Sequence, residues 1–315
     1  MFVFLPPEGD KFIINSLLMT RNSWFHYLIL FIGILCISWS AIFVKLADVS
    51  GITSAFYRMS IGFLGVLPIW LMRRKRITDK KSVRIAILCG VIFACDIAVW
   101  NVSILLTKAA ISTLIANLAP VWVGIGAILF LKEKPGRIFW IGTVIALMGV
   151  AVIVGIDKIY NSRLNAGHFL AILASLFYAF YLLIMRKGRL HLDTVTFTMI
   201  SMLASSVVLL LIAVFTGSHL SGFSLQSWEA LIGLGLISQL GGWLAINYAM
   251  GYITPTFASV SLLSQSVFTA LIAIPVLGEK LTKIEIFGAL IVLSGIFLVN
   301  KKMFKRKVAV QQEYD

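Results

Sequence analysis

The chain has few of the residues that build charged surfaces, disulfide frameworks and metal centres. Only 13% of its 315 residues are charged, and it contains three cysteines and four histidines. Cys36, Cys89 and Cys95 all lie within apolar stretches and the histidines are scattered, so their spacing predicts neither disulfides nor a metal site. A glycine-rich phosphate loop, an HExxH motif and a nucleophile–base pattern are also missing. We therefore expect no enzyme, and no catalytic residue, cofactor or metal.

Long apolar runs dominate the chain instead, since 60% of its residues are hydrophobic. A helix that crosses ~30 Å of hydrocarbon needs about 20 residues, and backbone groups in lipid must find their partners within the helix. We identify ten such runs, at residues 25–47, 51–72, 83–107, 109–131, 138–156, 166–185, 194–215, 228–250, 255–277 and 284–300. The sequence predicts an all-α polytopic membrane protein with ten transmembrane helices.

The net charge of +14 is explained by membrane orientation, without nucleic acid as a partner. If the N-terminus is cytoplasmic, twenty Lys and Arg residues fall on the inner face and six on the outer face. Cytoplasmic loops of membrane proteins carry this kind of excess. We expect a multi-pass protein of the plasma membrane, with both termini in the cytoplasm and a basic tail on the lipid headgroups.

The second half of the chain repeats the first at an offset of 146. Residues 98–152 correspond to 244–298, and eleven of the 29 positions from 121 to 149 are identical. Five spans per copy is an odd number, so the second copy starts on the opposite side of the membrane and the two repeats are inverted. Transporters use inverted repeats for alternating access, with the substrate site between them.

This repetition predicts the domain organisation. The expected parts are a cytoplasmic segment (1–24), a first five-helix repeat (25–156), an outer linker (157–165), a second five-helix repeat (166–300) and the basic tail (301–315). Met19 is a second candidate start besides Met1. A homodimer is compatible with this organisation.

Each half also ends with the same series of motifs. An apolar span is followed by LKEK or LGEK, and then by a span whose two glycines are seven residues apart, Gly142 and Gly149 or Gly288 and Gly295. FYRMSIGFL (56–64) and FYAFYLLIMRK (177–187) lie earlier in each half. In this order and duplication the motifs resemble the EamA-type family of the drug/metabolite transporter (DMT) superfamily.

The resemblance implies ten helices, a central cavity lined mainly by spans 1–4 and 6–9, and export or uptake of small metabolites, with export favoured. One position departs from the repeat. Pro120 should free the Ala116 carbonyl and bend span 4, but the equivalent residue in the second copy is Ser266. The sequence leaves open whether spans 4 and 9 bend alike.

Two ionisable residues lie deep inside the predicted spans, where a charge costs about 2.5–3.5 kcal/mol. Arg58 is the eighth residue of span 2 and Asp96 is the fourteenth of span 3. At 1.5 Å per residue they lie ~10 and ~15 Å from the outer ends, which predicts a salt bridge between them. The pair is either static, or Arg58 attracts a substrate carboxylate while Asp96 titrates or binds an amine. In the second case protons are the expected coupling ion.

Uncharged polar and aromatic residues form a second set of substrate-binding candidates. A cavity with aromatic walls and a few amides suits a small amphiphilic metabolite. Gln239, Trp243 and Asn247 share one face of span 8 by their spacing. The other candidates are Trp39, Trp100, Asn117, Tyr178 and Gln265. Each of them alone is also explained by interhelical hydrogen bonding or by packing.

Together these observations predict a secondary transporter, a permease or exporter of a small organic metabolite such as an amino acid or a related compound. A multidrug exporter of the same superfamily is an alternative, although span 1 (25–47) lacks the carboxylate that would bind a lipophilic cation. From other classes, an intramembrane enzyme or a non-transporting membrane scaffold remains to be tested against transport.

Overall fold

The computed structural model describes residues 23–73, 79–106, 109–155, 165–189, 192–278 and 282–312, and the regular elements in these ranges are helices. The first half contains α2 (Ser23–Ser38), α3 (Ser40–Ala47), α4 (Gly51–Arg73), α5 (Lys80–Leu106), α6 (Ala109–Ala116), α7 (Ala119–Leu131) and α8 (Arg137–Val154). The second half contains α10 (Ala166–Arg189), α11 (Thr194–Phe215), α12 (Leu225–Gly233), the π-helix η2 (Leu234–Gly242), α13 (Trp243–Met250), α14 (Pro255–Leu262), α15 (Ser264–Leu277) and α16 (Lys283–Gln312).

Ten helical spans in this part of the chain are long and apolar enough to cross a membrane. Their ends lie within four residues of the predicted ones, so the ten-span prediction is confirmed. Spans 1, 4 and 9 each consist of two helices, α2–α3, α6–α7 and α14–α15, and span 8 consists of α12, η2 and α13. Met19 and almost all of the predicted linker lie outside the described residues.

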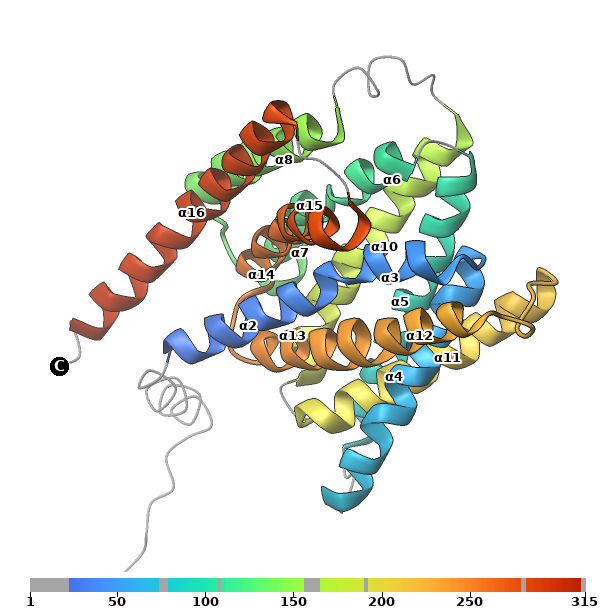
Figure 1. The fold of residues 1–315 in the computed structure, drawn as a ribbon. Helices are drawn as coiled ribbons and strands as arrows, with labels where there is room; N and C mark the ends of the chain where they lie inside the picture. The colour runs from blue at the N-terminus through green and yellow to red at the C-terminus, as the bar shows by residue number, and fades with distance from the viewer. Residues whose placement is uncertain are drawn as a thin grey trace, which may run out of the picture.

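Helix contacts follow a two-fold exchange of the two halves. Three pairs join equivalent spans: α4 packs on α11, α7 on α14 and α8 on α16. The most extensive of the other contacts occur in matched sets, so that α5 on α10 corresponds to α13 on α2, and α7 on α10 to α15 on α2. In Figure 1, α8 and α16 lie side by side at one edge, apart from the crossed helices of the centre. This exchange is the arrangement expected of inverted repeats.

Glycines bring α8 and α16 into close contact. A Cβ atom added to Gly142 would lie 2.7 Å from the carbonyl oxygen of Gly295, and one added to Gly149 would lie 2.7 Å from that of Gly288. Real Cβ atoms do not approach backbone atoms so closely, so each glycine is required for the backbones to touch. The glycine pairs predicted to mediate packing therefore face one another across this antiparallel helix pair.

Spans 4 and 9 are both interrupted at equivalent positions. Span 4 breaks at residues 117–118, and span 9 breaks at Leu263, the residue equivalent to Asn117. Pro120 lies in the first turn of α7, as the loss of its N–H predicts. The second copy has no proline at this point, but Ser264 donates to the carbonyl of Ser261 at 2.7 Å, a bond of the kind that bends helices. The bend is therefore common to both halves, although its local cause differs.

Candidate functional site

Arg58 lies on α4, where its guanidinium meets span 8. Its Nε donates to Oε1 of Gln239 at 2.7 Å, and the Gln239 side chain is only 2% exposed. Gly62, one turn further along α4, makes room for this contact, because a Cβ there would lie 2.8 Å from Cγ of Gln239. The only acceptor that the described residues offer Arg58 is thus an amide oxygen. The direct salt bridge predicted between Arg58 and Asp96 is wrong, since no N–O distance between them falls within 4.0 Å.

Asp96 lies on α5. Its carboxylate forms no hydrogen bond and no ion pair with the described residues. It still interacts electrostatically with Arg58 and with Tyr178, so the three side chains belong to one neighbourhood. All three are surrounded by protein but remain partly exposed. Each of the three keeps some accessible surface between the helices, and the guanidinium and the carboxylate are more than 4.0 Å apart.

Aromatic rings from three spans form a wall beside these charges. The Trp243 ring of α13 lies 4.7 Å from Phe93 of α5, 5.3 Å from Tyr181 and 6.2 Å from Tyr178 of α10, all in edge-to-face geometry. Phe93 also stacks on Tyr181 at 4.7 Å. Trp243 is buried, and its Nε1–H has no acceptor among the described residues. This wall can hold a cation or an apolar group.

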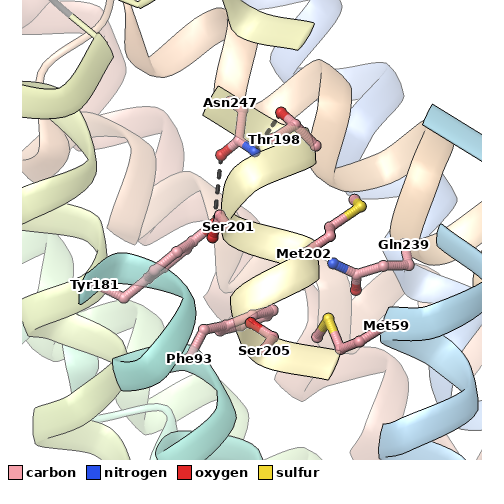
Figure 2. A pocket seen from close by; sticks show the side chains of 9 residues that line it. All are labelled: Met59, Phe93, Tyr181, Thr198, Ser201, Met202, Ser205, Gln239 and Asn247. Atoms are coloured by element: carbon pink, nitrogen blue, oxygen red, sulfur yellow. Dashed lines mark hydrogen bonds between the residues drawn. The ribbon is translucent and has the colours of Figure 1, made fainter. Parts of the chain in front are cut away.

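A small polar pocket continues from this wall toward α11 (Figure 2). The non-atom space there, including open solvent, is about 190 Å³, and the pocket is too tight to admit a water molecule. Asn247 closes one end, accepting from Tyr181 Oη at 3.3 Å and donating to Thr198 Oγ1 at 2.9 Å. The lining residues are Met59, Phe93, Tyr181, Thr198, Ser201, Met202, Ser205, Gln239 and Asn247.

The structure thus brings together six of the ten predicted site residues. Arg58, Asp96, Tyr178, Gln239, Trp243 and Asn247 belong to this central region, and we call the space between Arg58, Asp96 and the aromatic wall the central site. The predicted i, i+4, i+8 spacing on span 8 holds, although a π-helix provides part of it.

Two predicted residues lie instead at the break of span 1. Trp39 connects α2 to α3 and stacks on Phe43 with centroids 5.6 Å apart. Gln265 of α15 donates to the carbonyl of Ile37 at 3.3 Å, and Thr269 donates to that of Ser38 at 2.8 Å. These bonds satisfy carbonyls that the interrupted helix leaves free, so the contacts observed for Gln265 are structural.

The last two candidates, Trp100 and Asn117, carry buried donors. Trp100 Nε1 and Asn117 Nδ2 have no acceptor among the described residues. Asn117 lies at the break between α6 and α7. Buried unpaired donors cost free energy, so both groups are suited to a polar solute. Trp100 lies one turn after Asp96 on α5, whereas Asn117 belongs to another span.

Sequence reasoning missed the contribution of span 7. Thr198, Ser201 and Ser205 lie on one face of α11 at i, i+3, i+7 spacing, and together they line the pocket. That spacing of hydroxyl groups within an apolar helix was a usable signal. The described residues include no group of three His, Cys, Asp or Glu side chains that could hold a metal ion.

Ten spans in two inverted halves, with unpaired polar groups at their centre, define the class of polytopic membrane transporters. The sequence model of the EamA-like transporter family matches residues 24–155 and 165–301, one match for each half. The chain belongs to this family, which is part of the drug/metabolite transporter superfamily.

Curated relatives cover most of the chain. "Uncharacterized transporter YdfC" of Bacillus subtilis (strain 168) is 22% identical over 253 residues, covering 80% of this chain and 82% of its own. An "Uncharacterized transporter" of Clostridium kluyveri is 25% identical over 293 residues, covering 86% and 94%. A solved crystal structure of a protein aligns with 87% of this chain and 96% of its own at a TM-score of 0.74 and 15% identity, which shows the fold alone.

Proposed function

We propose that this membrane transporter moves a small organic metabolite that carries a carboxylate and an amine, such as an amino acid or a related compound, by alternating access. One observation supports the substrate class above all. Arg58 and Asp96 interact electrostatically without forming an ion pair, and within the described part of the chain the guanidinium is bonded to an amide oxygen alone. A zwitterionic solute fits between them with its carboxylate on Arg58 and its ammonium on Asp96.

The physical argument is one of compensation. Charges inside a membrane are expensive, and the usual solution is a partner of opposite sign. Here the two opposite charges lie in one neighbourhood yet apart, so a solute with both charges satisfies each of them at once. The bond from Arg58 to Gln239 has one ionised partner, whereas a solute carboxylate would make both partners ionised and can accept two parallel N–H bonds, which favours the carboxylate as the partner of Arg58.

The inverted halves support alternating access. Because the spans exchange by a two-fold operation, the packing on one side of the site has a counterpart on the other side. We further propose export across the plasma membrane, cytoplasmic termini and proton coupling through Asp96. Protonated Asp96 loses its attraction for an ammonium group, so proton binding and solute binding compete.

Counterflow in proteoliposomes tests this function. Vesicles loaded with an unlabelled amino acid should take up the labelled compound, and a pH gradient should drive net movement. Arg58→Gln and Asp96→Asn should strongly weaken exchange, whereas Glu285→Gln, at the exposed start of α16, should leave it intact. Exchange of lipophilic cations but not of amino acids would favour a multidrug exporter. Absence of flux across a broad metabolite panel would favour an enzyme or a scaffold.

A further inference from the structure

We propose that the hydroxyl-lined pocket on α11 is a second subsite of the translocation path, and that Gln239 separates it from the central site. The inference rests on the proposed function and deepens it. The ligand is the same solute, one that carries a carboxylate together with groups able to hydrogen-bond hydroxyls.

Gln239 contacts both compartments. Its Oε1 accepts from Arg58 at the central site, and its side chain also lines the pocket beside Met59 and Met202. Figure 2 shows the amide pointing into the pocket between these two methionines, across from Ser201. Gln239 itself is buried, at 2% exposure, where the two regions meet.

The pocket has the polar groups of a binding site. Ser201 Oγ and Gln239 Nε2 have no hydrogen-bond partner among the described residues, and each of these two atoms retains some accessible surface. Thr198 and Ser205 already bond Asn247 Nδ2 and the Gly90 carbonyl, at 2.9 and 2.7 Å. In this structure the pocket is too tight for water, so the two unbonded groups can meet a solute only after the Gln239 side chain has moved, while the two bonded ones hold the wall in place.

The pocket lies further along the path than the central site. Arg58 is seven residues from the start of α4, whereas Ser201 is seven residues from the start of α11, which runs in the opposite direction through the inverted half. Beyond the pocket, Arg189 links the ends of the surrounding helices, since its Nε donates to the Asn247 carbonyl at 2.9 Å and its Nη2 to Thr194 Oγ1 at 2.7 Å. The order across the membrane is thus central site, Gln239, pocket and Arg189.

In this order, solute binding at the central site can displace the Gln239 side chain that separates the central site from the pocket. A solute carboxylate that binds the guanidinium side-on, through Nε and Nη2, displaces Gln239 Oε1 from Nε and so releases the Gln239 side chain. A ligand shifts a conformational equilibrium only by its differential affinity for the two states, and the competition for Arg58 provides that difference. The π-helix around Gln239 (Leu234–Gly242) is the kind of irregular turn that recurs at functional sites.

Cysteine accessibility tests the proposal without a known substrate. Cys36, Cys89 and Cys95 are replaced by alanine, Ser201→Cys is introduced, and vesicles of each orientation are treated with a membrane-impermeant methanethiosulfonate ammonium reagent. Adding Gln239→Ala should raise the labelling rate of Ser201→Cys at least tenfold, from the face at which α4 begins. Gln239→Glu, whose carboxylate bonds Arg58 more strongly, should lower that rate.

Ser206→Cys is the matched control, because Ser206 is buried on the same helix but does not line the pocket. Equal labelling of Ser201→Cys in all three backgrounds would overturn the proposal, and so would an equal rise at Ser206→Cys. If Gln239→Ala fails to fold, the comparison of Gln239→Glu with its parent decides alone. A lack of amino-acid counterflow would refute the proposed function but would leave this labelling result unchanged.

Discussion

The glycine contact between α8 and α16 gives the sharpest prediction about stability. In Gly149→Ala the new Cβ would lie 2.5 Å from the Val292 nitrogen and 2.7 Å from the Gly288 carbonyl oxygen. Ordinary contacts begin at about 3.4 Å, so the helices must separate by roughly 0.7–0.9 Å, and overpacking of this size costs about 1–3 kcal/mol. We expect a clear fall in the thermal unfolding midpoint of the purified protein in detergent.

Gly136→Ala, at the N-cap that precedes α8, is the control, because a Cβ there meets nothing within 4 Å, its φ of −71° suits alanine, and the loss of a glycine cap that makes no side-chain bond is small. Gly288→Ala should behave like Gly149→Ala, since the two glycines face each other. The double variant Gly149→Ala/Gly288→Ala should lose less than the sum of the two single losses, because helices that are already separated accommodate the second methyl group. If Gly149→Ala unfolds at the same temperature as Gly136→Ala, the close contact of α8 and α16 is refuted.

Three further outcomes follow. Asp96→Asn should remove the attraction of the carboxylate for a solute ammonium group. A hydrogen bond to a charged group contributes about 1.5–3 kcal/mol, so the apparent affinity for the solute should fall roughly 10- to 150-fold. Unchanged counterflow and pH dependence would exclude Asp96 from the site. Glu133→Gln breaks a 2.5 Å ion pair with Arg186, but both side chains are about one-third exposed, so the loss of stability should stay below about 1 kcal/mol; a larger loss in chemical unfolding would contradict this. Glu285→Ala removes a capping box in which the Glu285 carboxylate accepts hydrogen bonds from the backbone N–H and the hydroxyl of Thr282. The loss should destabilise the start of α16 by about 0.5–2 kcal/mol, which is measured as faster amide exchange in its first turn. Unchanged exchange there would count against the cap.

Much of the architecture was predictable because it depends on periodic features of the sequence. Apolar length marks the ten spans, and the offset of 146 pairs Gly142 with Gly288 and predicts their common role in packing. The capping box at Thr282 was equally readable, since its residues are local. The break in span 9 was less accessible, because a serine bonded to a carbonyl three residues earlier replaces the proline that bends span 4.

The candidate site was predictable in membership more than in contacts. Depth along the helix correctly placed Arg58 and Asp96 in one neighbourhood, but depth says nothing about side-chain direction. Gln239 reaches Arg58 where span 8 forms a π-helix and where Gly62 on α4 leaves room for the Gln239 side chain. Neither feature can be read from the spacing of apolar residues in the sequence. Likewise, Gln265 bonds a carbonyl of an interrupted helix, an opportunity that exists only once α2 ends at Ser38.

The contact between α8 and α16 also carries evolutionary information. Gly142 and Gly288 are equivalent positions of the two repeats, as are Gly149 and Gly295, and each glycine touches the non-equivalent glycine of the other half. This reciprocity is the signature of an isologous interface, in which one surface recognises its own copy. Two separate five-helix chains of opposite orientation could form the same contact, because each half presents the surface that the other half needs.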